Sequence, residues 1–278
     1  MGRLSSIEWT HHTFNPWWGC VKVSSACDNC YAESWAKRVG QAVWGSGASR
    51  RFFGEAHWRE PIRWNKEAQS LNQRQRVFCA SMADVFEARK DLASERERLW
   101  DLIKKTPALD WLLLTKRPQN ISRLCPWASS GEWPANLWLG TTIENQAVAK
   151  KRLPHLLKHR SVVRFLSCEP LLGPLDLSEI QDEAENSIDW IIAGGESGHH
   201  ARPMNPAWVR KLRDFARKNA IAFHFKQWGH WAPSVTNSQK ESRIITIDGH
   251  RMAAIGKLKA GRLLDGQTWD GLPARKAA

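Results

Sequence analysis

Short, continuous apolar runs recur along the chain and are separated by longer polar segments. Five of these runs are Trp111–Leu114, Leu137–Leu139, Val162–Leu166, Trp190–Ala193 and Ile221–Phe225. Continuous rather than alternating apolar runs are typical of parallel strands that are covered on both faces of their sheet. Two earlier segments, Ile7–Phe14 and Arg76–Ser81, predict two further strands.

Segments with one apolar face lie between the predicted strands. Residues Ser94–Lys105 place their leucines and isoleucine on one helical face, and Tyr31–Val39 also reads as a helix. The clearest helix is Pro206–Lys218, because Asn205 suits the N-cap position and proline suits the first helical position. This alternation predicts an α/β protein, a full or partial (β/α) TIM-type barrel of about six or seven parallel strands.

The end of the chain has a different pattern. Residues Arg243–Ile247 and Arg251–Ile255 flank the dipeptide Asp248-Gly249, which favours a hairpin turn. A polar tail follows, from residue 256 to residue 271. We therefore expect a barrel over residues 1–229, which carries a cysteine loop at 20–30, and a small C-terminal hairpin appendage over residues 230–278.

Composition narrows the class of protein. The chain has 278 residues, of which 42% are hydrophobic, so it can bury a substantial core. No apolar run approaches the roughly 18 residues that a membrane helix needs, and the first residues lack the apolar centre of a signal peptide. Together with cysteines that are clustered rather than spread, this predicts a cytoplasmic protein without a membrane partner.

The net charge is +13. Such an excess of lysine and arginine favours a polyanionic partner, by counterion release and by electrostatic steering. The 17 tryptophans could stack on bases, although filling a core is the commoner use of each. Nucleic acid or a nucleotide is therefore the expected partner, and a basic but otherwise ordinary surface is the alternative.

Three cysteines, Cys20, Cys27 and Cys30, lie within eleven residues, with six residues between the first two and two between the last two. Thiolates select zinc, copper(I) or iron–sulfur clusters. A structural zinc site needs four protein ligands, and the nearest other candidates are His11 and His12. A [4Fe–4S] cluster can use three cysteines when a small molecule supplies the remaining ligand. The widely spaced Cys79, Cys125 and Cys168 are expected to be buried small hydrophobes.

The segments Asn15-Pro16-Trp17-Trp18-Gly19-Cys20 and Cys27-Asp28-Asn29-Cys30-Tyr31-Ala32 resemble the three-Cys-motif family of phage-associated proteins. That family is largely uncharacterised and is similar to a variant of the radical SAM superfamily. The spacing departs from the common radical SAM motif, which has three residues between its first two cysteines. The aromatic Tyr31 also follows the third cysteine instead of preceding it, so a role in stacking on adenine does not transfer to it.

Polar residues follow each predicted strand, and in a parallel barrel such residues converge on one rim. The resemblance implies that several of them bind S-adenosylmethionine at the open iron of a cluster held by Cys20, Cys27 and Cys30. These candidates are Ser81, Met82, Asp84, Thr142, Glu144, Ser167, Glu169, Gly194 and Gly195. The candidates for substrate binding and catalysis are Glu196, Lys116 and Lys226, joined at the rim by Arg117, Arg202, His199 and His200.

The resemblance implies a radical SAM-type enzyme. Such an enzyme takes an electron from a donor, cleaves S-adenosylmethionine and removes a hydrogen atom from its substrate, here expected to be a nucleic acid or nucleotide. Whether a partner protein is needed stays open. The alternative is a non-catalytic, zinc-stabilised nucleic-acid-binding protein. No Gly-x-Ser-x-Gly motif follows a predicted strand, and no phosphate-binding P-loop is present.

Overall fold

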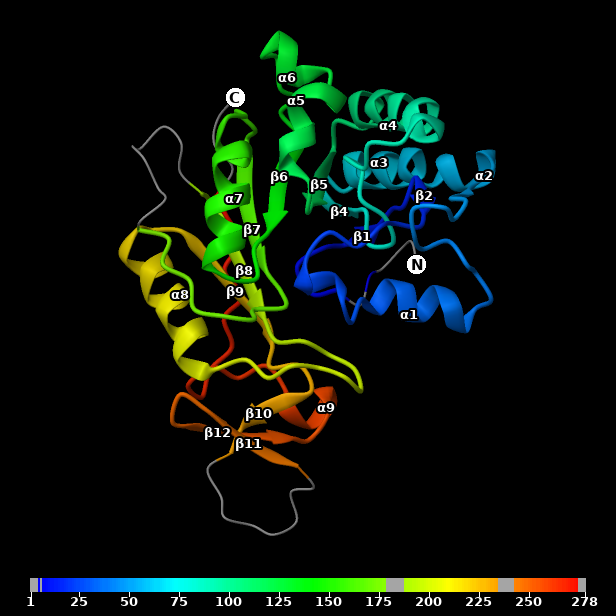
Figure 1. The fold of residues 1–278 in the computed structure, drawn as a ribbon. Coiled ribbons are helices and arrows are strands. Elements are labelled where there is room, and N and C mark those ends of the chain that lie inside the picture. Colours follow the sequence, from blue (N-terminus) through cyan, green and yellow to red (C-terminus); the bar gives the residue numbers. More distant parts are fainter. Residues whose placement is uncertain (1–4, 6, 179–187, 235–242, 275–278) are drawn as a thin grey trace.

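The computed structural model describes residues 5, 7–178, 188–234 and 243–274. Its main element is a sheet of seven parallel strands in the order β1-β4-β5-β6-β7-β8-β9. These strands are β1 (His12–Thr13), β4 (Gln75–Cys79), β5 (Leu109–Thr115), β6 (Leu137–Thr142), β7 (Val163–Cys168), β8 (Trp190–Gly194) and β9 (Ala222–Gln227). The sheet curls into a half-barrel whose edges are β1 and β9 (Figure 1). The partial TIM-type architecture predicted from the apolar runs is therefore confirmed.

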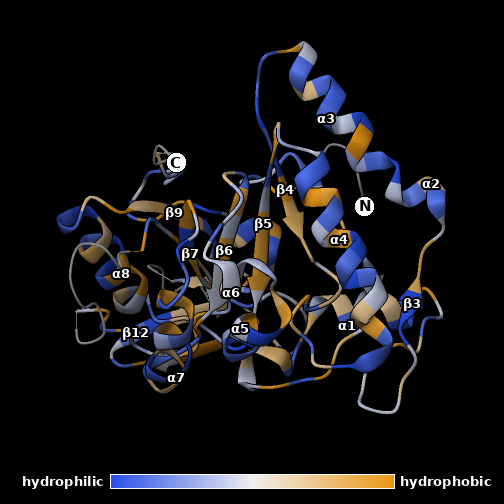
Figure 2. Cartoon of the chain, turned by 90° about the horizontal axis from the view of Figure 1, so that it is seen from above, coloured by the Kyte–Doolittle hydropathy of each residue, from blue (hydrophilic) through white to orange (hydrophobic). Residues whose placement is uncertain are grey.

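Helices connect the strands, and all but α1 (Tyr31–Arg38), which packs in a separate small cluster with Val43 and Met82, lie on the convex face of the sheet. The others are α2 (Glu55–Trp58), α3 (Glu60–Ser70), α4 (Ala93–Lys105), α5 (Ile121–Leu124), α6 (Trp127–Ser130), α7 (Gln146–Leu157) and α8 (Pro206–Lys218). Helix α8 has the predicted bounds, and the Asn205 side chain accepts a hydrogen bond from the Ala207 amide as its N-cap. In Figure 2 the strands of the sheet are mostly apolar, whereas helices such as α4 carry both apolar and polar residues.

Two apolar clusters lie on opposite faces of the sheet. The larger cluster packs side chains of α4, α7 and α8 against the convex face. The smaller cluster fills the lower part of the concave face with Phe78, Trp138, Phe165 and Trp190, and Trp9 packs against it. Gly140 in β6 makes room for this cluster, since a Cβ atom there would lie 2.4 Å from the Phe165 ring. This cluster fills part of the concave face, and the face stays open at the carboxyl ends of the strands.

The first strand is shorter than expected. We predicted a strand over Ile7–Phe14, but β1 contains only His12 and Thr13. The apolar residues before it pack into the concave face instead of pairing with β4, as the position of Trp9 shows. A short strand that was not predicted, β3 (Arg51–Phe52), pairs with β2 (Trp17–Trp18) just before Cys20.

The C-terminal residues form a small antiparallel sheet in the order β10-β12-β11. The predicted hairpin is confirmed as β11 (Ile244–Ile247) and β12 (His250–Ala254), and β10 (Trp231–Pro233) adds a strand that was not expected. Helix α9 (Lys257–Ala260) follows. The tail then returns to the half-barrel, where the Gly271 amide donates to the Phe223 carbonyl in β9. The boundary at residue 230 between two folding units stays a prediction.

Among the described residues, no helix is both long enough and apolar enough to cross a membrane.

Candidate functional site

A pocket of about 860 Å³ opens at the carboxyl ends of the parallel strands. Its walls are the strand-end loops, the cysteine loop (residues 20–30) and part of the C-terminal segment. The predicted site residues that line it are Cys20, Cys27, Cys30, Ser81, Met82, Asp84, Lys116, Arg117, Thr142, Ser167, Glu169, Gly195, Glu196 and Lys226. Glu144 and Gly194 do not line it, and neither do His199, His200 and Arg202. The expected convergence of strand ends on one rim therefore holds for most of these residues.

The six cysteines divide into two groups. Cys20, Cys27 and Cys30 are half-buried, free and face the pocket. Cys79, Cys125 and Cys168 are buried and free, and burial raises the pKa of each of these thiols. Only the first group can offer sulfur atoms to a ligand in the pocket.

The three pocket sulfur atoms are not yet arranged as a chelate. The part of the chain that the structure describes contains no group of three His, Cys, Asp or Glu side chains close enough to hold a metal ion. Binding a metal centre would therefore require the cysteine loop to draw the sulfur atoms together. Burial, and then the nearby Asp84 charge, raise the pKa of Cys20 to about 11, although Arg117 opposes this.

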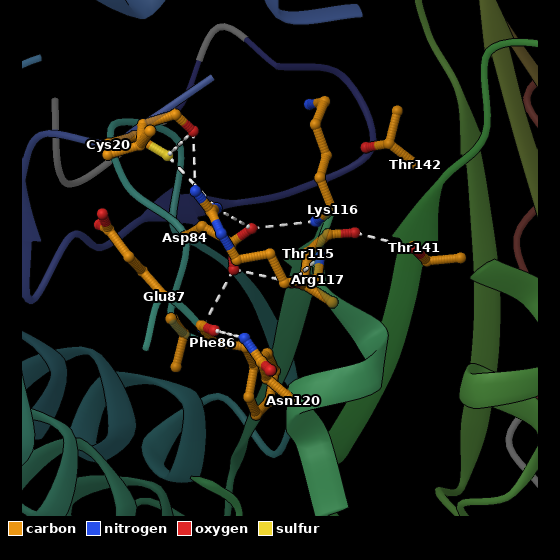
Figure 3. A network of polar contacts seen from close by, with 12 residues as sticks. Cys20, Asp84, Phe86, Glu87, Thr115, Lys116, Arg117, Asn120, Thr141 and Thr142 are labelled. Atoms are coloured by element: carbon orange, nitrogen blue, oxygen red, sulfur yellow. Dashed lines mark hydrogen bonds and ion pairs between the residues drawn. The ribbon is translucent and has the colours of Figure 1, made fainter. Parts of the chain in front are cut away.

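Three buried carboxylates hold the cysteine loop. The first is Asp84, which follows β4 and binds the Arg117 guanidinium at 2.8 Å (Figure 3). Arg117 also donates to the Val21 carbonyl at 2.7 Å and lies 3.5 Å from Cys20 Sγ. Asp84 accepts further hydrogen bonds from the Thr115 hydroxyl and the Lys116 amide. This ion pair fixes the beginning of the loop to the ends of β4 and β5.

The second carboxylate belongs to Glu144, which is fully buried. One oxygen accepts a hydrogen bond from the Ala26 amide of the cysteine loop, and the other accepts one from Arg152 of α7 at 3.1 Å. Arg152 also donates to the Thr142 carbonyl. The Glu144 carboxylate is thus directed at the loop backbone and at Arg152.

The third carboxylate belongs to Glu196, which follows β8. It accepts hydrogen bonds from the Arg202 guanidinium, the closest at 2.6 Å, and from the Asn29 side-chain amide at 2.9 Å. Arg202 also donates to the Ser25 carbonyl at 2.8 Å and to Asp28. Burial alone would raise the pKa of Glu196, but the hydrogen bonds from Arg202 and Asn29 outweigh it and lower the pKa.

The sequence alone does not identify these three pairs. It predicts Asp84 and Glu144 as ligands for S-adenosylmethionine and Glu196 as a substrate or catalytic group. In the structure each carboxylate binds an arginine, and Glu144 and Glu196 also accept hydrogen bonds from the cysteine loop. Arg152 was not expected at the site, and the only sign of its pairing with Glu144 is its position eight residues later, on the helix that follows β6.

Other pocket residues keep polar groups that the protein does not fully use. Thr142 is completely buried, lines the pocket, and its hydroxyl has no hydrogen-bond partner within the described ranges. The Lys116 side chain points away from the Asp84–Arg117 network in Figure 3, and its ammonium group forms no ion pair with any described residue. Glu169 and Lys226 pair with each other at 2.9 Å.

Packing requires a glycine at position 195, directly after β8. A Cβ atom at Gly195 would lie 2.0 Å from the Trp228 carbonyl oxygen, so β8 and the segment after β9 can approach only if residue 195 is glycine. Binding of S-adenosylmethionine by Gly194 and Gly195 stays a prediction.

The histidines considered as a fourth metal ligand lie elsewhere. His12 is buried, pairs through Nε2 with Gln75 and stacks on Trp64. His11 accepts a hydrogen bond from the Arg76 amide through Nδ1. Neither histidine lines the pocket.

Comparison with known proteins gives one family and one group of structures. A family model described as "Protein of unknown function (DUF5131)" matches residues 4–273. No curated protein matches the sequence. Three solved structures of mutant spore photoproduct lyase align at 10–12% sequence identity, cover 91% of this chain and 71–72% of theirs, and give TM-scores of 0.43–0.44.

Proposed function

This chain belongs to the DUF5131 family of proteins of unknown function, and we propose that it is a radical SAM-type enzyme that acts on a nucleic acid or nucleotide. The observation that carries the proposal is the gathering of Cys20, Cys27 and Cys30 in one pocket with most of the residues expected to bind S-adenosylmethionine. The resemblance of the cysteine segment to the three-Cys-motif family supports the same reading.

The number and type of the sulfur donors suit the proposed cluster once the cysteine loop draws them together. Three sulfur ligands leave one iron of a [4Fe–4S] cluster free to bind a small molecule. A buried hydroxyl without a partner costs roughly 1–3 kcal/mol, so the Thr142 side chain favours a ligand that hydrogen-bonds there. When bound, such a cluster supplies the electron that cleaves S-adenosylmethionine, and the resulting organic radical removes a hydrogen atom from the substrate.

The protein's own residues have three tasks in this proposal. Cys20, Cys27 and Cys30 hold the cluster, and the Asp84–Arg117, Glu144–Arg152 and Glu196–Arg202 pairs position their loop. Thr142, Ser167 and the Glu169–Lys226 pair face the pocket and orient the bound molecule. The half-barrel walls limit the access of water and of other reactants.

The charge of the pocket rim supports an anionic substrate. Lys116 and Lys257 both line the pocket, and neither ammonium group is in an ion pair within the described part of the chain. With a net charge of +13, these groups favour a phosphate-bearing substrate. An external electron donor is also required.

The zinc alternative needs a fourth protein ligand. His11 and His12 already use ring nitrogens in hydrogen bonds and do not line the pocket. A structural zinc site with a nearby histidine is therefore less well supported than a cluster.

Metal analysis of anaerobically purified protein tests the proposal. We expect about four iron and four sulfide per chain, and no cluster absorbance after replacement of Cys20, Cys27 or Cys30 by alanine. The matched controls Cys79→Ala, Cys125→Ala and Cys168→Ala should keep the absorbance. Stoichiometric zinc without iron after anaerobic reconstitution would contradict the proposal. An intact cluster that neither binds nor cleaves S-adenosylmethionine would contradict it as well.

A further inference from the structure

Leu258 is the most exposed large apolar side chain in the described ranges. It is 96% exposed, whereas the other exposed large apolar side chains range from 37% to 58%. It lies in α9, between Lys257 and Lys259, and it lines the mouth of the pocket. An apolar side chain in this position is unfavourably hydrated until a partner covers it.

Helix α9 holds Leu258 on a well-anchored turn. The amides of Ile255 and Gly256 both donate to the His230 carbonyl before the helix, and the Trp228 amide donates to the Gly261 carbonyl after it. Ile255 and Ala260 pack against the main apolar cluster. The exposure of Leu258 therefore belongs to a fixed turn rather than to a free end.

The surroundings of Leu258 are basic. Lys257 and Lys259 form no ion pair with any described residue. Arg262 lines the same mouth, and its guanidinium binds Glu8 and Asp270, which ties α9 to the segment before β1. A partner that fits this surface must offer negative charge on both sides of an apolar slot.

We propose that Leu258 is a wedge that enters between stacked bases of a duplex nucleic acid while Lys257 and Lys259 contact the flanking phosphates. The inference rests on the proposed function and names its substrate class. Apolar side chains inserted at a base step unstack it at a cost of about a few kcal/mol. The unstacked nucleotide can then leave the helix and enter the pocket of about 860 Å³ next to the wedge.

A DNA duplex that carries 2-aminopurine tests this directly, because the fluorescence of this base rises when it is unstacked. Wild-type protein should bind the duplex at low salt and increase the fluorescence. Leu258→Ala should abolish most of the increase and weaken binding by about tenfold, the order expected for loss of a buried leucine. Leu258→Met, which keeps a long apolar side chain, should retain both properties.

Leu71→Ala is the matched control, since Leu71 is 58% exposed at the end of α3 and does not line the pocket. It should behave as the wild type does. If Leu258→Ala bound the duplex and increased the fluorescence as the wild type does, the wedge would be wrong while the proposed enzyme class stood. If the wild type bound no duplex even at low salt, the wedge and the duplex substrate would both fail, and the iron content of the same sample would report separately on the cluster.

Discussion

Thr141 and Thr142 are neighbours at the end of β6, and their two buried hydroxyl groups differ in hydrogen bonding. Thr141 Oγ1 donates to the Thr115 carbonyl of β5 at 2.9 Å. Thr142 Oγ1 has no partner in the described part of the chain, and Thr142 lines the pocket. One hydroxyl therefore belongs to the sheet, whereas the other is a buried, unsatisfied group in the wall of the pocket.

Replacing each threonine by valine separates these two uses. Thr142→Val should leave the free energy of unfolding unchanged or raise it, because an unsatisfied buried group is removed, but it should weaken binding of S-adenosylmethionine by about tenfold. Thr141→Val should lower the free energy of unfolding by about 1 kcal/mol and leave binding nearly unchanged. Urea unfolding and calorimetric titration measure the two effects. Equal binding by wild type and Thr142→Val would show that this hydroxyl does not contact the ligand.

The Glu196–Arg202 pair should control the mobility of the cysteine loop. Arg202→Lys keeps the charge but loses the two-pronged contact with Glu196 and the hydrogen bond to the Ser25 carbonyl. Since hydrogen bonds to charged groups contribute about 1.5–3 kcal/mol, amide hydrogen exchange over residues 25–28 should become more than tenfold faster. Arg210→Lys is the control, because Arg210 makes a similar two-pronged contact with Asp265 outside the pocket. Unchanged exchange in Arg202→Lys would contradict a positioning role.

Lys116 should contribute to nucleic-acid affinity more than a basic residue on a helix does. The Lys116→Glu variant removes a pocket charge that forms no ion pair with a described residue, whereas Lys151→Glu changes an exposed position on α7. We expect Lys116→Glu to reduce affinity by about tenfold and to lower the slope of log affinity against log salt by about one. Reversal of Arg117 would be a poor test, since Arg117 also binds Asp84 and the cysteine loop. Equal losses in Lys116→Glu and Lys151→Glu would point to non-specific attraction.

His224 should make the fold sensitive to mild acid. It is 2% exposed, and its ring nitrogens form no hydrogen bond with any described group. The Asp270 carboxylate lies 3.7 Å from Nδ1, which is too long for a hydrogen bond. Burial, and then the positive charge of Arg262, lower its pKa to about 4. In the unfolded chain the pKa of this histidine is about 6.5. At pH values between about 6.5 and the lower folded pKa, the unfolded chain therefore binds a proton that the folded protein does not.

The free energy of unfolding should therefore fall by about 2 kcal/mol from pH 7 to pH 5 through this residue alone. His224→Gln removes the titrating group and should flatten that part of the pH profile, as measured by urea unfolding. His199→Gln, at an exposed position, should keep the wild-type profile. A profile in His224→Gln as steep as that of the wild type would show that other groups are responsible.

The parallel strands could be predicted because they are buried on both faces, so their apolar runs are continuous and easily recognised. The same rule failed before β1. Ile7 and Trp9 are apolar because they pack on the concave face, and an apolar pattern does not distinguish such packing from pairing with a neighbouring strand. Helix α3 was not predicted, although it buries Trp64 and Ala68.

The sequence predicts where the site lies, but it does not predict which side chains pair with one another there. Strand order and strand ends bring Thr142, Glu169 and Lys226 to one rim, which follows from the geometry of a parallel sheet alone. The partner of each carboxylate depends on distances between loops. Glu196 meets Asn29, 167 residues earlier in the chain, and no local pattern in the sequence contains that information.

The return of the tail to β9 fixes when the pocket can form during synthesis. The Phe225 amide donates to the Trp269 carbonyl, and the Trp190 indole donates to the Gly271 carbonyl, so these late residues cover the outer edge of the half-barrel. Residues 257–262 add one side of the pocket mouth. A ribosome-bound chain that has reached only β9 therefore exposes a bare strand edge and an incomplete pocket. The pocket therefore becomes complete, and the edge of β9 covered, only after residue 271 has left the ribosome.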